Sequence, residues 1–86
     1  MELKDTIEMM QSDDYKERFK AEYYQLVIRY KKLNTMFVNW DKLDFTPNCP
    51  KHTIMMQLRT MFDYISVLKA RAEYEGIELE DLTGGK

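Results

Sequence analysis

Two series of apolar residues, each spaced alternately by four and three positions, constrain the fold of this chain most strongly. The first series is Phe19, Tyr23, Leu26, Tyr30, Leu33, Phe37 and Trp40, and the second is Ile54, Leu58, Met61, Ile65, Leu68 and Ala72. This spacing produces a heptad seam along one face of an α-helix. Since only a short segment containing Pro47 and Pro50 separates the two series, they predict an antiparallel helical hairpin.

The first long helix is predicted over residues 14–40, which contain neither glycine nor proline. Ser12 or Asp13 is expected to cap it, because a side-chain oxygen there can accept a free N–H of the first turn. A short helix is predicted before it, over residues 2–10, from three apolar residues at helical spacing. These residues are Leu3, Ile7 and Met10.

The second long helix is predicted over residues 50–75. Pro50 fits its first position, where the missing N–H removes no hydrogen bond. Gly76 is expected to end the helix in a left-handed conformation, with Ile77 folded back on the last turn. Two apolar residues of the preceding connection are expected to tuck against the end of the hairpin. They are Leu43 and Phe45.

The predicted fold class is all-α, with a single domain over residues 1–79 and a flexible tail over residues 80–86. Two helices do not enclose a core, and the short helix can cover only part of the remaining apolar surface. That surface comprises Tyr24, Val27 and Ile28 on the helix predicted over residues 14–40, and Met55, Met56 and Phe62 on the helix predicted over residues 50–75. Because a single cysteine excludes an internal disulfide, the sequence predicts assembly into an oligomeric helical bundle.

Composition excludes several classes of function. A net charge of −2 disfavours a general DNA or RNA binder. No apolar run reaches the ~20 residues of a membrane span, and the N-terminus lacks a signal-peptide pattern, so we expect a cytoplasmic protein without a membrane partner. All three glycines lie at or beyond Gly76, so no glycine-rich phosphate loop is present.

Two clusters could be interpreted as chemical sites. Cys49 and His52 could form a nucleophile–base pair, but the sequence offers no third, orienting group. Three acids at the start of the second helix could hold a metal, although placement of negative charge at a helix N-terminus explains them more simply. These acids are Asp13, Asp14 and Glu17. We therefore predict no enzyme activity, no metal and no cofactor.

The start of the second helix combines basic and aromatic residues. Six of the 13 basic residues lie there, namely Lys16, Arg18, Lys20, Arg29, Lys31 and Lys32. They alternate with Tyr15, Phe19, Tyr23, Tyr24 and Tyr30. Aromatic rings stack on nucleobases and cations pair with phosphates, so the pattern suits a small nucleotide ligand. A solvated basic face beside core tyrosines is the alternative interpretation. Tyr15 lies outside the seam and is the best placed for stacking.

The residues that resemble a known family lie on both long helices. The motif Tyr15-x-x-Arg18-Phe19, followed by Glu22, Leu26, Arg29 and Lys32-Leu33, resembles the second helix of small phage-encoded cyclic-oligonucleotide sponges. Those proteins counter CBASS, a bacterial immune system that signals with cyclic nucleotides. The third helix of that family is resembled by Gln57, Met61, Tyr64, Leu68 and Arg71. The resemblance covers about residues 15–37 and 54–75.

The resemblance implies one short and two long helices assembled into a hexamer in the cytoplasm of the infected bacterial host. It implies that cyclic di- and trinucleotides are bound at subunit interfaces and released intact. Carried over to this chain, Tyr15 would stack on a base and Arg29 or Lys32 would pair with a phosphate. Arg71 would belong to a second type of pocket. Arg18, from the basic cluster that also contains Arg29 and Lys32, completes the candidate ligand-binding residues.

Two other functions remain open from the sequence. The chain could be a phage protein that binds and inhibits a host protein through its apolar face. It could also be a structural or assembly helper that has no ligand.

Overall fold

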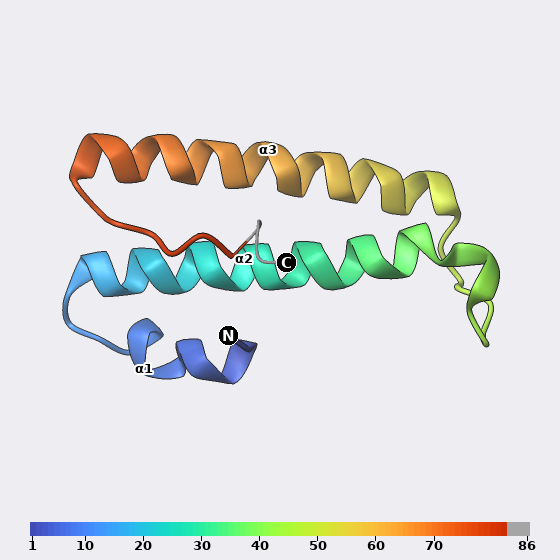
Figure 1. Ribbon diagram of the computed structural model, residues 1–86, viewed down its shortest axis with the longest axis horizontal. Coiled ribbons are helices and arrows are strands. Elements are labelled where there is room, and N and C mark those ends of the chain that lie inside the picture. The colour runs from blue at the N-terminus through green and yellow to red at the C-terminus, as the bar shows by residue number, and fades with distance from the viewer. Residues whose placement is uncertain (83–86) are drawn as a thin grey trace.

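The fold is a helical hairpin against which the N-terminal segment and residues 77–82 pack (Figure 1). A computed structural model describes residues 1–82. The long helices are α2 (Tyr15–Val38) and α3 (Lys51–Glu75), which run antiparallel, and a 3-10 turn, η2 (Trp40–Lys42), lies in their connection. The N-terminal segment consists of the 3-10 helix η1 (Leu3–Thr6) and the single-turn α1 (Ile7–Met10). The predicted all-α fold with a long hairpin is confirmed.

The residue that caps helix α2 lies one or two positions after the predicted cap. The Asp14 carboxylate, and not Ser12 or Asp13, accepts the N–H of Lys16, at 3.0 Å. The Ser12 hydroxyl instead accepts the N–H of Asp14, at 3.0 Å, and so stabilises the turn before the helix. The far end of α2 lies at Val38, two residues before the predicted position.

Helix α3 is preceded by Pro50, which has an extended backbone and caps the helix without occupying its first position. At the other end Gly76 adopts the expected left-handed conformation, with φ of 68°. The N–H of Ile77 then returns to the carbonyl of Ala72, at 2.9 Å, and the Ile77 side chain is buried. The predicted end of this helix is therefore confirmed, and it turns the chain back toward α2.

The N-terminal segment packs through a different face from the one predicted. Ile7 and Met10 are half exposed, whereas Thr6 is fully buried and Met9 packs against the core. The Thr6 hydroxyl can be buried because it donates to the carbonyl of Leu3, at 2.7 Å, and accepts from the Gln25 amide, at 2.9 Å. A helix of one turn is too short for apolar spacing to fix its buried face.

Residues 77–82, here called the C-terminal arm, run back along α2 (Figure 1). The backbone N–H of Glu80 donates to the hydroxyl of Tyr24, at 3.0 Å, and Lys31 donates to the carbonyl of Leu82. The sequence predicts flexibility from residue 80 onward, whereas the structure holds Glu80 and Leu82 against α2. Residues 83–86 of the predicted tail lie outside the described part of the chain.

Burial is uneven along the hairpin. The core cluster joins Phe19, Tyr23, Tyr24, Val27, Ile65, Leu68, Ala72 and Ile77, all toward the end where α2 begins. Tyr24, Val27 and Ile28, which were predicted to need a cover, are buried within one copy of the chain. Nearer the connection, Ile54 and Leu58 of α3 are buried outside this cluster, whereas Phe45 is exposed although the sequence predicts it to pack there. Leu43 is half-buried.

The burial of Tyr23 gives a testable pH dependence. Its side chain is 1% exposed, and burial, with a contribution from Asp81, raises its pKa above the ordinary value of 10.0. The unfolded chain therefore loses this proton more readily than the folded chain. Folding stability should be unaffected below about pH 10 and should fall as the pH rises through the folded-state pKa. In Tyr23→Phe this alkaline loss should be shallower, as measured by urea unfolding at about pH 8 and about pH 11.

The control for this variant is Tyr74→Phe, because Tyr74 is 91% exposed on α3. It should follow the wild-type decline. Equal alkaline losses in Tyr23→Phe and the wild type would contradict the assignment.

Candidate functional site

The predicted ligand-binding residues fall at separate places on one copy of the chain. Tyr15 and Arg71 meet at the end of the hairpin, where α2 begins and α3 ends. Arg29 and Lys32 lie further along α2. We call Tyr15, Phe19, Arg71 and Glu75 the terminal cluster, and the hollow that contains Arg29 and Lys32 the central groove.

The terminal cluster is built around the Arg71 guanidinium. Its central carbon lies 4.9 Å from the centroid of the Phe19 ring, which makes a cation–π contact. Its Nε and one terminal nitrogen donate to the Glu75 carboxylate, at 3.3 and 3.1 Å. The antiparallel hairpin brings these residues of α2 and α3 together, although more than 50 positions separate Phe19 from Arg71 in the sequence.

Tyr15 occupies the first position of α2 and remains 49% exposed. A hydrogen bond to the Glu75 carboxylate is the main reason that the pKa of its hydroxyl is raised, while the nearby Arg71 lowers that pKa. The phenol is therefore neutral at physiological pH. An exposed aromatic ring beside a guanidinium can stack on a base and contact a phosphate at the same place.

The central groove is a hollow of about 450 Å³ between η1, α2 and α3. Arg29 and Lys32 contribute its positive charge, and Gln57 of α3 adds an amide. The other lining residues are apolar, namely Leu3, Leu33, Met36 and Met61. Lys32 also lines a second hollow of about 240 Å³, together with Met1, Ile28, Lys31 and Leu82. Lys32 therefore lies between two concave surfaces, where an anion could approach from either side.

Arg18 has a structural contact. One terminal nitrogen of its guanidinium donates to the carbonyl of Ser12, at 2.7 Å, and so holds the turn that leads into α2. Its side chain is exposed, yet it lies neither in the terminal cluster nor in the central groove. The structure thus gives Arg18 a contact within the turn that precedes α2.

Tyr15 and Lys32 are distant within one copy. At ~1.5 Å per residue, they lie about 25 Å apart along the axis of α2. The terminal cluster and the central groove are therefore separate surfaces on one copy of the chain.

The family model of Sequestin matches residues 13–74, which include nearly all of α2 and α3 and three of the four residues of the terminal cluster. The chain belongs to the Sequestin family. The resemblance to the phage anti-CBASS sponges is thereby confirmed, and the family indicates a binding role, in which a ligand is sequestered, rather than catalysis. No curated protein and no solved structure matches the chain with significant similarity.

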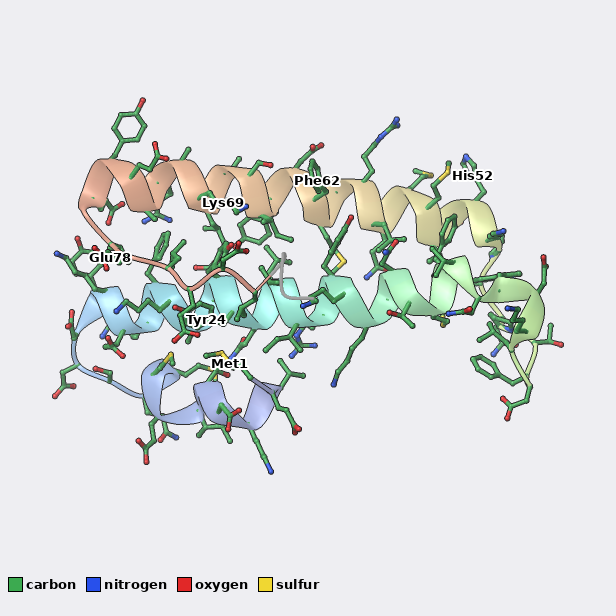
Figure 2. The ribbon with its side chains drawn as sticks, viewed as in Figure 1. Met1, Tyr24, His52, Phe62, Lys69 and Glu78 are labelled. Carbon is green, nitrogen blue, oxygen red and sulfur yellow. The ribbon has the colours of Figure 1, made fainter. Side chains whose placement is uncertain are left out.

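In this member of the Sequestin family, the structure places the residues considered for catalysis or metal binding as follows. Cys49 is half-buried in the connection, and His52 is exposed at the start of α3 (Figure 2). Asp14 caps α2, and Glu17 pairs with Lys20, at 3.4 Å. Within residues 1–82 no group of three metal-ligating side chains is present. No helix in that part of the chain is long and apolar enough to cross a membrane.

Three residues of the site were not among the sequence candidates, namely Phe19, Gln57 and Glu75. Phe19 was predicted to lie in the seam and in the family motif, but its contact with the Arg71 guanidinium was not predicted. The spacing of Arg71 and Glu75 was a usable signal, because residues four apart on a helix are neighbours. Gln57 could be placed in the central groove only from the packing of α3 against α2.

Proposed function

We propose that this protein binds cyclic oligonucleotide second messengers, namely cyclic di- or trinucleotides, and sequesters them without cleavage in the cytoplasm of an infected bacterium. It would thereby act as a phage counter-defence protein. The observation that carries the proposal is the meeting of Tyr15 and Arg71 at the end of the hairpin with both side chains exposed. Membership of the Sequestin family supports the sequestering role.

The chemistry of such a ligand matches both parts of the surface. A cyclic oligonucleotide repeats a base and a phosphate around a ring, so it needs stacking surfaces and cations at more than one place. The terminal cluster supplies the ring of Tyr15 and the charge of Arg71. The central groove supplies Arg29 and Lys32 above an apolar floor. A partner subunit would complete each site by bringing the second part close to the first.

Assembly of several copies is part of the proposal, and we propose a hexamer. Several large apolar side chains of α3 remain exposed in one copy, among them Met55, Met56 and Phe62. Figure 2 shows Phe62 near the middle of α3. Large apolar side chains exposed on one helix favour an interface there. Copies that pack there would bury these side chains and fix the relative positions of their incomplete sites, with closed symmetry repeating each site.

Sequestration requires affinity and copy number, and it needs no chemical step. Rigid helices on either side of a pocket lower the ordering cost of binding. A panel of cyclic di- and trinucleotides in a thermal-shift assay tests the proposal. A ligand present at about 100 times its Kd stabilises the folded state by about 2.7 kcal/mol. Recovery of the intact ligand by chromatography after denaturation separates sequestration from turnover.

Tyr15→Ala should remove most of the ligand-dependent thermal shift. Loss of a stacked base costs about 1–3 kcal/mol, which lowers affinity by about 5-fold to 150-fold. The matched control is Tyr74→Ala, which removes the same side chain from an exposed position of α3. Equal ligand responses in the two variants would contradict stacking on Tyr15.

The exposed apolar surface of α3 also favours a second candidate function, namely inhibition of a host protein bound at that surface. In that case the Tyr15→Ala variant would keep its partner, and no cyclic nucleotide would stabilise the wild type. The two candidates are therefore separated by the same experiment.

A further inference from the structure

The Glu75 carboxylate is already paired with the groups of the terminal cluster that the proposed ligand would contact. Its carboxylate accepts hydrogen bonds from Nε and one terminal nitrogen of Arg71, and it is also hydrogen-bonded to Tyr15. The carboxylate therefore stands where a ligand phosphate would pair with Arg71. The Glu75 side chain is only 29% exposed, whereas that of Arg71 is 51% exposed.

Helix stability does not explain a carboxylate at this position. Glu75 is the last residue of α3, where the negative end of the helix dipole disfavours an acid. An Arg followed four positions later by a Glu is also the weaker order for a helical ion pair. The helix dipole thus opposes Glu75, and the helical ion pair favours it only weakly. A role in the binding site therefore explains its contact with Arg71 and Tyr15 better than helix stability does.

We propose that Glu75 is a built-in competitor of the phosphate, which holds Arg71 and Tyr15 until a ligand with several contacts displaces it. This inference rests on the proposed function, because it concerns the same site. A lone phosphate would only exchange one anion for another at Arg71 and would gain little. A cyclic oligonucleotide also stacks a base and places further phosphates on other cations, so it outcompetes the carboxylate. Glu75 thereby selects against free phosphate and mononucleotides, which would otherwise fill the site.

The test compares the full-length wild type with Glu75→Gln, and inorganic pyrophosphate is the probe. The Arg71 Nε–H resonance is followed by nitrogen-edited NMR as pyrophosphate is added. Glutamine keeps the shape of the side chain and removes its charge, so the variant should fold. Because one repulsive charge beside the anion is removed, Glu75→Gln should respond at a concentration about five to ten times lower than the wild type.

Glu73→Gln is the matched control, because it removes an equal charge two residues away, from an exposed position of α3. It should behave like the wild type. The inference is overturned if the wild type and Glu75→Gln respond equally, including no response in either. It is also overturned if Glu73→Gln gains as much as Glu75→Gln.

A second titration keeps this inference separate from the proposed function. AMP and cyclic triadenylate are added to the same proteins, and Glu75→Gln should bind AMP more tightly by a larger factor than it binds cyclic triadenylate. If cyclic oligonucleotides bind none of the proteins, the proposed function fails, whereas the pyrophosphate comparison still decides whether Glu75 competes for Arg71.

Discussion

Leu68→Ala is expected to lower the free energy of unfolding by about 2–5 kcal/mol. Leu68 is 1% exposed and lies in the core cluster between α2, α3 and the C-terminal arm. Truncation removes buried apolar surface and leaves a cavity that two long helices cannot easily close. For a chain of this size the loss is a large part of the total stability.

Val67→Ala is the matched control for this change. Val67 is the neighbouring residue of α3, but its side chain is 56% exposed, so its truncation should change stability by less than about 0.5 kcal/mol. Urea unfolding at one fixed protein concentration gives both values, since association would contribute to the measured stability. Similar losses in the two variants would contradict the placement of the core on the Leu68 side of α3.

Lys32→Glu is expected to weaken cyclic-oligonucleotide binding by about 100-fold, because a charge-assisted contact to phosphate is replaced by repulsion. Mixing this variant with Tyr15→Ala tests where the two residues meet. If Tyr15 and Lys32 of one pocket belong to different subunits, a mixed oligomer rebuilds intact pockets. Equal amounts of the two variants, refolded together, should restore about one quarter of the wild-type binding sites.

Two results would contradict a site to which one subunit contributes Tyr15 and another contributes Lys32. No recovery, in an oligomer shown by mass spectrometry to contain both variants, would place Tyr15 and Lys32 in separate pockets. A wild type that sediments as a monomer at micromolar concentration, and still binds the ligand, would contradict the shared site altogether. Lys42→Glu is the control, because it reverses a charge in η2, away from both parts of the site.

The sequence predicts the hairpin because both seams repeat with a helical period and the seams have similar lengths. It also predicts the end of α3, since Gly76 is the residue that accepts a left-handed backbone at low cost. The C-terminal arm could not be predicted in the same way. An extended segment has no helical period, and its position depends on contacts with other segments, such as the hydrogen bond from the Glu80 N–H to the Tyr24 hydroxyl. Its contacts with α2 exist only after the hairpin has formed.

The candidate site was predictable to a similar degree. Tyr15 and Arg71 were predicted to lie in different pockets, although an antiparallel hairpin brings the start of one helix beside the end of the other and so explains their proximity. The contact of Arg18 with the Ser12 carbonyl depends on the local path of the turn before α2. No pattern of residue types specifies that path. The participation of Glu75 depends on the rotamers of two long side chains, which the sequence leaves open.

The uneven covering of the hairpin also has a dynamic consequence. Within residues 1–82, the half where α2 begins is held by the N-terminal segment, the C-terminal arm and the core cluster, whereas no buried residue of that cluster lies near η2. Local opening of the native state will begin in the thinner half, at a lower free energy than opening of the core. A molecule that docks beside η2 would therefore rigidify the part of the hairpin that fluctuates most.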